Sequence, residues 1–377
     1  MQQNKTQICD VMVTYCWNRV GYTIVKNLTK HGLRVIVCDT STTNICSKSH
    51  YSMGSFSYPD PFTEEDAFII VLKKAVETHK PKVLLPTHDE SVIIAKHRSE
   101  FPKDLVIPVV DADLQLLLAD KHQTALIARE LGIPCPKNID DISKCDYPIV
   151  VKTKVGNSAK GVFFPKTQKE TETLITEYGR ENLLISEFIG GCDYSVDIVC
   201  SKEQVFASVY QAMVTKTEGG GTTTQRVMVD EPELIEYAIR FVKYVGYEGV
   251  LGFDWRVDKE RGKIAFIEIN ARYTGGLATP VCAGFDIPWI HYCLATKGRY
   301  DESVNVKIGV KTKWILGDII TFVTRVCHLN LSWRELKALL SFKFDGFDDY
   351  EKGDLKALWG EMVYYFVKLA KNKKLNP

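Results

Sequence analysis

The stretch FIEINARYTGG, residues 266–276, sets one acid, one amide and one arginine at alternate positions of an apolar run. Because successive side chains of a β-strand point to opposite faces, Glu268, Asn270 and Arg272 should form one polar row. Ile267 and Ile269 should then face the core. Alternation alone is equally typical of a solvated strand face, so neighbouring residues must show whether the row does chemistry.

A second strand-like stretch, GVLGFDWRVD, precedes this row, and KERGK between the two has the composition of a turn. A hairpin symmetric about Arg261 places Asp254 directly opposite Glu268. Facing carboxylates destabilise a strand pair unless a counter-charge lies between them. Carboxylate and amide oxygens suit Mg²⁺, so Asp254, Glu268 and Asn270 are candidate metal ligands.

Three glycine-rich loops could bring backbone close to a ligand: VGNSAKG at 155–161, TEGGGTTT at 217–224, and YTGGLATPVCAG after the polar row. The first follows a strand that ends at Lys152, whose ammonium would lie beside backbone donors to a phosphate. It is not a P-loop, because Val162 stands where that motif requires lysine. For the second loop, around 219–221, a surface linker remains the alternative.

The stretch NLLISEFIGGCDYSVDIVC predicts two strands interrupted at Gly190 and Gly191. Two acids, Glu187 and Asp193, flank the interruption. They indicate either a ligand-binding turn or the polar turn of a plain hairpin.

The composition is that of a globular protein with an ample core: 377 residues, 45% of them hydrophobic and 25% charged, which suggests two or three domains. A net charge of +1 argues against binding nucleic acid or a charged membrane by global electrostatics. The 11 cysteines form no C-x-x-C pair. They predict reduced, buried thiols, including Cys38, Cys200 and Cys282. No run is apolar enough for a signal peptide or a membrane span, so we expect a cytoplasmic protein without stable membrane insertion.

The first third alternates strand and helix patterns, from DVMVTY through EEDAFIIVLKKAVETH to KVLLPTHDE. A β-α-β-α-β order predicts a parallel sheet, and ligands of such sheets bind beyond the carboxyl ends of the strands. Those ends are residues 15–18, Asp39 and residues 87–90. No G-x-G-x-x-G follows the first strand, so we do not expect a nicotinamide cofactor.

The last stretch, LKALWGEMVYYFVKLAKNKK, repeats apolar residues at helical spacing. We expect this stripe to pack against the body rather than to lie on a membrane, because the lysines gather at one end. The stripe consists of Leu355, Leu358, Trp359, Met362, Val363, Phe366 and Leu369.

Taken in order, the lysines, the glycine-bounded loop and the acids resemble the ATP-grasp superfamily over residues 8–300. IEINAR is most similar to its carbamoyl-phosphate-synthase-like, carboxylate-amine ligase branch. The resemblance implies an α/β and α+β fold with a parallel-sheet (pre-ATP-grasp) domain at 1–118 and a two-lobed ATP-grasp domain at 119–300. A small lid lobe would span 137–190, and a partly helical extension 301–377.

The resemblance also implies residue roles. Lys121 and Lys152 would hold the ATP phosphates, and Arg272, with Lys152, would act on the transferred phosphoryl group. Asp193 would accept the ribose hydroxyls, at a position where family members more often carry glutamate. Two Mg²⁺ ions, with Mn²⁺ as the alternative, would bind Asp254, Glu268 and Asn270. The remaining nucleotide-binding residues implied are Gly156, Ser158 and Gly161 in the closing loop, and Glu187, Phe188 and Ile189 around the adenine.

The activity implied is an ATP- and Mg²⁺-dependent ligase that joins a small-molecule carboxylate to an amine through an acyl phosphate. The alternatives are a kinase-like phosphoryl-transfer enzyme and a non-catalytic nucleotide-binding regulatory protein. For Asp89 and Glu90, a role as favourable charges at the start of the helix ESVIIAKH is as good an interpretation as contact with the substrate. The expected partners are small molecules and, for assembly, a second copy in a homodimer. Candidate substrate contacts are Thr87, Asp89, Glu90, Thr274, Gly275 and Gly276.

Overall fold

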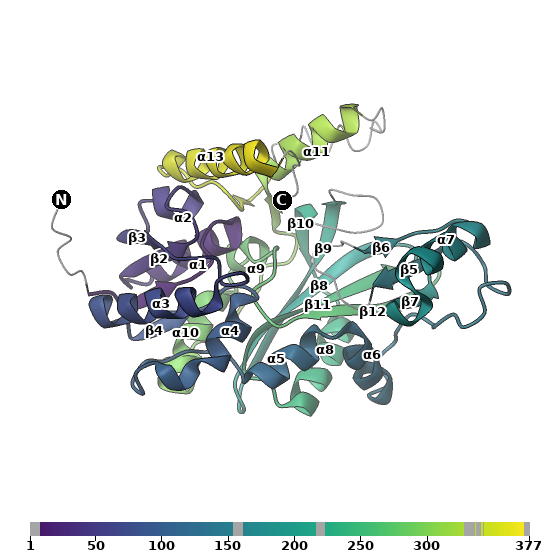
Figure 1. Cartoon of the computed structure of the whole chain (residues 1–377), viewed down its shortest axis with the longest axis horizontal. Helices are drawn as coiled ribbons and strands as arrows, with labels where there is room; N and C mark the ends of the chain where they lie inside the picture. The colour runs from purple at the N-terminus through teal and green to yellow at the C-terminus, as the bar shows by residue number, and fades with distance from the viewer. Residues whose placement is uncertain are drawn as a thin grey trace.

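The computed structural model describes residues 8–153, 161–215, 223–327, 336, 341 and 343–372. Within these ranges, sheets of four, seven and three strands are flanked by helices (Figure 1). The expected combination of a parallel sheet, a second mixed α/β region and a partly helical C-terminal part is confirmed. None of the helices in the described ranges has the length and apolar content needed to span a bilayer.

The N-terminal sheet has the order β3-β2-β1-β4, and each of its strand pairs is parallel, as the sequence predicts. Strand β1 packs into two hydrophobic cores: Val11 and Val13 lie on the α1 side of the sheet, and Met12 lies on the α3 side. The sequence analysis did not predict strand β3, because GSFS is short and only half-buried and has little of the apolar pattern of a strand. The elements are β1 (Val11–Val13), α1 (Arg19–Lys30), β2 (Val35–Asp39), α2 (Ile45–Lys48), β3 (Gly54–Ser57), α3 (Glu65–His79), β4 (Val83–Leu85), α4 (Glu90–Lys96) and a 3₁₀ turn (Arg98–Glu100).

The seven-stranded sheet has the order β12-β11-β8-β9-β10-β13-β14 and is antiparallel except for the last pair. Helices α5, α6 and α8 bury apolar side chains against strands β8, β11 and β12, and lie below them in Figure 1. The elements are α5 (Ala112–Ala119), α6 (Lys121–Glu130), β8 (Cys192–Cys200), β9 (Val205–Thr215), β10 (Thr223–Val229), α8 (Pro232–Val245), β11 (Gly249–Asp258), β12 (Lys263–Asn270), α9 (Ala278–Cys282) and α10 (Ile287–Lys297).

The three-stranded sheet forms a separate small lobe with α7 (Figure 1). Strand β7 lies in this sheet and the next strand, β8, lies in the seven-stranded sheet, so the plain hairpin considered for NLLISEFIGGCDYSVDIVC is wrong. The crossing uses Gly191, where φ is 79° and an added Cβ would lie 2.0 Å from the Val257 carbonyl oxygen. The elements are β5 (Ile149–Thr153), β6 (Val162–Phe163), α7 (Gln168–Tyr178), a 3₁₀ turn (Arg180–Asn182) and β7 (Leu183–Glu187).

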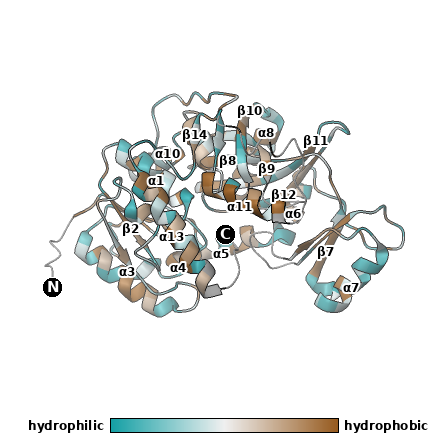
Figure 2. Cartoon of the chain, turned by 90° about the horizontal axis from the view of Figure 1, so that it is seen from above, coloured by the Kyte–Doolittle hydropathy of each residue, from teal (hydrophilic) through white to brown (hydrophobic). Residues whose placement is uncertain are grey.

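The C-terminal part extends the large sheet and then returns over the N-terminal sheet domain (Figures 1 and 2). The last helix packs against the body, through α2, but mainly with the face opposite the predicted apolar stripe. Of the stripe, Leu355, Trp359 and Phe366 are exposed, whereas Leu358, Met362 and Val363 are half-buried. The small residue Gly360 allows this close approach, since a Cβ there would lie 2.5 Å from the Asn44 carbonyl oxygen. The elements are β13 (Lys311–Lys313), α11 (Ile315–Cys327), β14 (Gly346–Phe347) and α13 (Leu355–Asn372).

The ten cysteines whose side chains the structure describes are free thiols, as expected. Cys38 and Cys200 are buried, but Cys282 is exposed, which corrects the prediction for that residue. It is the last residue of α9 and lies outside the buried segment 278–280 of that helix.

Candidate active site

The polar row lies on β12, at the edge of the seven-stranded sheet. The predicted pairing of Asp254 with Glu268 across β11 and β12 is confirmed, although the pairs nearer the turn lie one residue away from symmetry about Arg261. The register then shifts, since Trp255 pairs with Phe266 and leaves Ile267 as the extra residue of a β-bulge. Ile267 therefore lines the cleft beside Glu268 and does not face the core, whereas Ile269 is buried as predicted.

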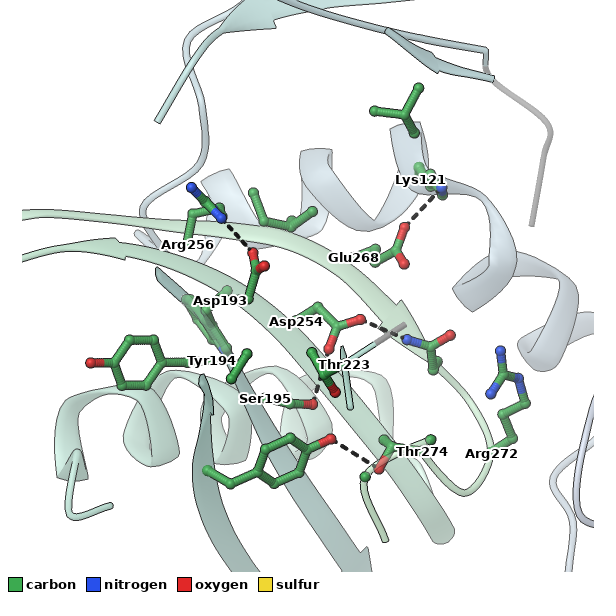
Figure 3. Close-up of a pocket in the computed structure, with 18 of the residues that line it drawn as sticks. Lys121, Asp193, Tyr194, Ser195, Thr223, Asp254, Arg256, Glu268, Arg272 and Thr274 are labelled. Atoms are coloured by element: carbon green, nitrogen blue, oxygen red, sulfur yellow. Dashed lines mark hydrogen bonds and ion pairs between the residues drawn. The ribbon is translucent and has the colours of Figure 1, made fainter. Parts of the chain in front are cut away.

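The two facing carboxylates have different partners (Figure 3). Asp254 accepts hydrogen bonds from the Ser195 hydroxyl at 2.9 Å and from the Asn270 amide at 3.0 Å. Burial, together with the nearby Glu268 carboxylate, raises the pKa of Asp254 to about 7. Burial also acts on Glu268, but the cations of Lys121 and Lys152 outweigh it and lower the pKa of Glu268. The pair thus resembles a site that a cation would complete.

Two lysines bring positive charge to this pair from two other elements. Lys121, the first residue of α6, forms an ion pair with Glu268 at 2.8 Å. Lys152, near the end of β5 in the small lobe, lines the same cleft, and burial lowers its pKa. The predicted phosphate-binding lysines are therefore brought together with the acids.

The loop between β5 and β6 falls largely outside the described residues. The predicted Gly156 and Ser158 are therefore not described, and neither are residues 219–221 of the loop between β9 and β10. Gly161 is described. It has a φ of 79°, and an added Cβ would lie 2.3 Å from the Thr153 hydroxyl oxygen. Glycine is therefore required where the chain re-enters the small lobe.

The segment between the small lobe and the large sheet lines one side of the cleft with Glu187, Phe188 and Ile189. Asp193 follows on β8 and forms an ion pair with Arg256 at 2.8 Å. Arg256 also donates to the carbonyl oxygens of Ile189 and Gly191, so it fixes this segment to β11. The sequence analysis missed Arg256, because its role depends on the pairing of β8 with β11, which the sequence pattern did not predict.

The predicted substrate residues divide into two groups. Arg272 forms an ion pair with Asp89 at 3.0 Å, which joins the end of the polar row to the N-terminal domain. Glu90 is completely buried and accepts hydrogen bonds from the Thr14 hydroxyl and the Thr87 backbone N–H. It therefore holds the loop before α4 in place, in agreement with the alternative of a helix-start residue, and does not reach the cleft. Thr87, Thr274, Gly275 and Gly276 line the cleft.

The cleft has a volume of about 560 Å³ and is lined by all three parts of the chain. The N-terminal domain contributes Tyr15, Trp17 and Arg19, and the last helix contributes Tyr365 and Lys368. Except for the general placement of residues 15–18 at a strand end, the sequence analysis missed these residues as site residues. Tyr15 has a φ of 56°, an unusual conformation for a non-glycine residue that often accompanies function.

We expect Gly276→Ala to destabilise the fold by about 1–3 kcal/mol, the usual cost of overpacking. An added Cβ would lie 2.2 Å from the hydroxyl oxygen of buried Tyr210 and 2.3 Å from its Cζ. Chemical denaturation measures the loss. The same substitution in a Tyr210→Leu background should cost less, because the ring that it strikes is gone. Equal costs in both backgrounds would contradict the clash.

The comparisons with known proteins identify this arrangement. A family model for the ATP-grasp domain matches residues 118–276. This segment is an ATP-grasp domain. It contains the polar row, both lysines and the cleft-lining segment 187–189, so the predicted resemblance to the ATP-grasp superfamily is confirmed.

A curated relative is 27% identical over 139 residues, 36% of this chain. It is a 5-formaminoimidazole-4-carboxamide-1-(beta)-D-ribofuranosyl 5'-monophosphate synthetase from Methanosarcina barkeri, and the match spans 37% of its length. The two proteins are therefore compared over little more than a third of each chain.

Solved structures share the fold over most of the chain. A biotin carboxylase–β,γ-ATP complex from Campylobacter jejuni has a TM-score of 0.63 and 16% identity, covering 80% of this chain and 74% of that one. An L-amino acid ligase from Bacillus licheniformis has a TM-score of 0.62 and 16% identity, covering 80% and 78%. An N5-carboxyaminoimidazole ribonucleotide synthetase from Thermus thermophilus has a TM-score of 0.60 and 15% identity, covering 80% and 81%. At these identities the likeness concerns the ATP-grasp fold alone.

Proposed function

We propose that this protein is an ATP- and Mg²⁺-dependent ligase that joins a small-molecule carboxylate to an amine and releases ADP and phosphate. The observation that carries the proposal is the Asp254–Glu268 pair, which faces two lysines from other elements in one cleft. Support comes from the ATP-grasp domain and from fold neighbours that include an L-amino acid ligase and a ribonucleotide synthetase.

The donor set of the row fits Mg²⁺. Two carboxylates and one amide oxygen are hard oxygen ligands, and the Asn270 amide nitrogen already bonds Asp254, which leaves its oxygen for an ion. We assign Asp254, Glu268 and Asn270 as ligands of two ions, with Mn²⁺ as an alternative. The bound ions would supply charge neutralisation at the phosphates.

The chain itself contributes positioning and charge. Lys121 and Lys152 would hold the phosphates of ATP, and Arg272 would stabilise charge on the transferred phosphoryl group. A carboxylate oxygen of the substrate attacks the γ-phosphorus while the bond to the β,γ-bridging oxygen breaks, and ADP leaves. The amine then attacks the acyl carbon, loses a proton and displaces inorganic phosphate.

The remaining assignments follow the same reasoning. Phe188 and Ile189 would flank the adenine, the backbone at 187–189 would bind its edge, and Asp193 would accept the ribose hydroxyls. Asp193 is oriented by its ion pair with Arg256 at 2.8 Å, and its second carboxylate oxygen, Oδ2, would accept from the ribose. The expected homodimer and cytoplasmic location stay predictions.

We expect hydroxylamine to capture the acyl phosphate as a hydroxamate when ATP, Mg²⁺ and the correct carboxylate are present. The cations converge on the terminal phosphates, so cleavage at the β,γ-bridge is favoured and ADP is the nucleotide product. A panel of carboxylates, assayed by mass spectrometry, measures both products. AMP in place of ADP would reject the mechanism. A stable phosphorylated product without an amine requirement would favour the kinase alternative, and nucleotide binding without turnover on any pair would favour the regulatory one.

A further inference from the structure

A buried node of two arginines and one aspartate lies at the N-terminal-domain side of the cleft. Arg19, the first residue of α1, is 8% exposed, and its Nε donates to Asp348 Oδ2 at 3.1 Å. Arg226, on β10, donates from Nη1 to the same oxygen at 2.8 Å. The guanidinium of Arg19 lies 4.0 Å from the ring centroid of Trp314. The ion pair with Asp348 and the ring of Trp314 therefore fix the orientation of Arg19.

The two arginines differ in how their donors are used. Arg226 is fully buried and bonds through all three nitrogens, to Asp348 and to the hydroxyl and carbonyl oxygens of Thr223. Across the residues that the structure describes, Arg19 donates only through Nε, although a guanidinium has five N–H donors. Its Nη2 lies 3.3 Å from the position of a Cβ on Gly275, a residue of the cleft wall. The terminal nitrogens of Arg19 thus face the cleft.

The other acids near the node are engaged with other groups. Asp349 accepts the backbone N–H groups of Ile315 and Leu316 at the start of α11. Glu361 accepts the indole N–H of Trp314 at 3.2 Å, and burial raises its pKa well above the usual value. Within the described residues, Glu361 is close enough to Arg19 to attract it electrostatically, but neither carboxylate accepts a hydrogen bond from the terminal nitrogens of Arg19.

The wall around Arg19 is aromatic and carries no acid among the described lining residues of the N-terminal domain. Tyr15 stacks on His88 at 4.8 Å between ring centroids. Burial and the nearby Arg272 lower the pKa of His88 to about 3, so its ring is neutral. The acids that line the cleft lie on the strands of the ATP-grasp domain: Glu187, Asp193, Asp254 and Glu268.

We propose that Arg19 binds the carboxylate of the acid substrate, and that this substrate is a carboxylic acid with an aromatic or other apolar body. The inference rests on the proposed ligase function and specifies its substrate class. A guanidinium fork matches a carboxylate, and a rigid, partly desolvated fork binds more tightly than a mobile one. Tyr15, Trp17 and Tyr365 supply the surface that the body of the acid contacts.

The test measures direct binding, so it does not depend on turnover. The full-length protein, with and without MgADP, is titrated calorimetrically with benzoate, acetate and benzylammonium up to about 50 mM, a range that detects millimolar affinities. We expect saturable benzoate binding, weaker acetate binding and no benzylammonium binding. Arg19→Met should weaken benzoate binding by about 10-fold or more, the value of one charge-assisted pair.

Two further variants make the result decisive. Arg19→Lys keeps the charge and a partner for Asp348, so it serves if the Met variant fails to fold, and it should bind benzoate several-fold more weakly than the native protein. Arg299→Met, a matched control at an exposed arginine, should bind benzoate normally. Equal benzoate affinity in native and Arg19 variants, absence of benzoate binding to the native protein, or equal binding of benzylammonium would each overturn the proposal. Absence of MgADP binding to the native protein would instead reject the ligase function.

Discussion

We expect Glu268→Gln to reduce turnover by about 10²–10³-fold or more while leaving the chain folded. Glutamine keeps the shape of the side chain but removes the charge that faces Asp254 across the hairpin and that pairs with Lys121 at 2.8 Å. On the proposed assignment a carboxylate ligand of Mg²⁺ is lost, and the ammonium of Lys121 is left without its partner. The proposed charge neutralisation at the phosphates is then weakened at both points.

ADP release at increasing Mg²⁺ concentration measures the loss, and thermal unfolding checks the fold. Glu248→Gln is the matched control. Glu248 directly precedes β11 in the same domain, but its side chain is exposed, and its carboxylate lies 3.9 Å from the Lys202 ammonium. It should retain native activity. A folded Glu268→Gln protein with native turnover at ordinary Mg²⁺ would remove this residue from the metal site.

The parts of the site that the sequence predicts correctly are local in the chain. Asp254 and Glu268 are joined by one short turn, so counting residues from Arg261 comes within one residue of the true register, and the bulge at Ile267 brings the two acids opposite each other. Three strands of the first parallel sheet, β1, β2 and β4, were equally accessible, because they and the helices α1 and α3 have their own periodicity and clear end signals, whereas β3 does not. In both cases the physical constraint lies within a few residues of the element it shapes.

The parts that it misses depend on contacts between distant segments. Arg256 meets Asp193 only because β8 and β11 are neighbours in the sheet, and 329 positions separate Arg19 from Asp348. The bulge at Ile267 reverses one side chain, although the pattern of alternation looks regular. Periodicity shows which residues share a face, but it cannot show whether that face is covered.

The last helix illustrates this limit. The residues with the strongest apolar spacing, among them Trp359 and Phe366, are exposed, whereas the buried side includes Ala357, Gly360 and Glu361. Small residues permit close approach of α13 to α2, and the shape of the contact selects the buried face. The helix is held at the cleft by this contact, which explains how a C-terminal segment comes to line a site built mainly from other domains.

We expect Asp348→Ala to lower the free energy of unfolding by about 3–5 kcal/mol, the typical effect of removing one partner from a buried ion pair. Asp348 is 1% exposed and is shared by the guanidinium groups of Arg19 and Arg226. Its removal leaves two buried cations without their common counter-charge, and Arg226 is itself fully buried, so water cannot replace the lost bond.

Urea denaturation followed by tryptophan fluorescence measures this loss, with Asp301→Ala as the control, since Asp301 forms its ion pair at an exposed position. The control should change stability by less than about 1 kcal/mol. Asp348→Asn should be milder than Asp348→Ala, because the amide oxygen can still accept one hydrogen bond. If Asp348→Ala were as stable as the control, the node would contribute no net stability. If the destabilisation appears instead, the C-terminal segment, the first helix of the N-terminal domain and a central strand of the ATP-grasp domain are joined energetically through one carboxylate.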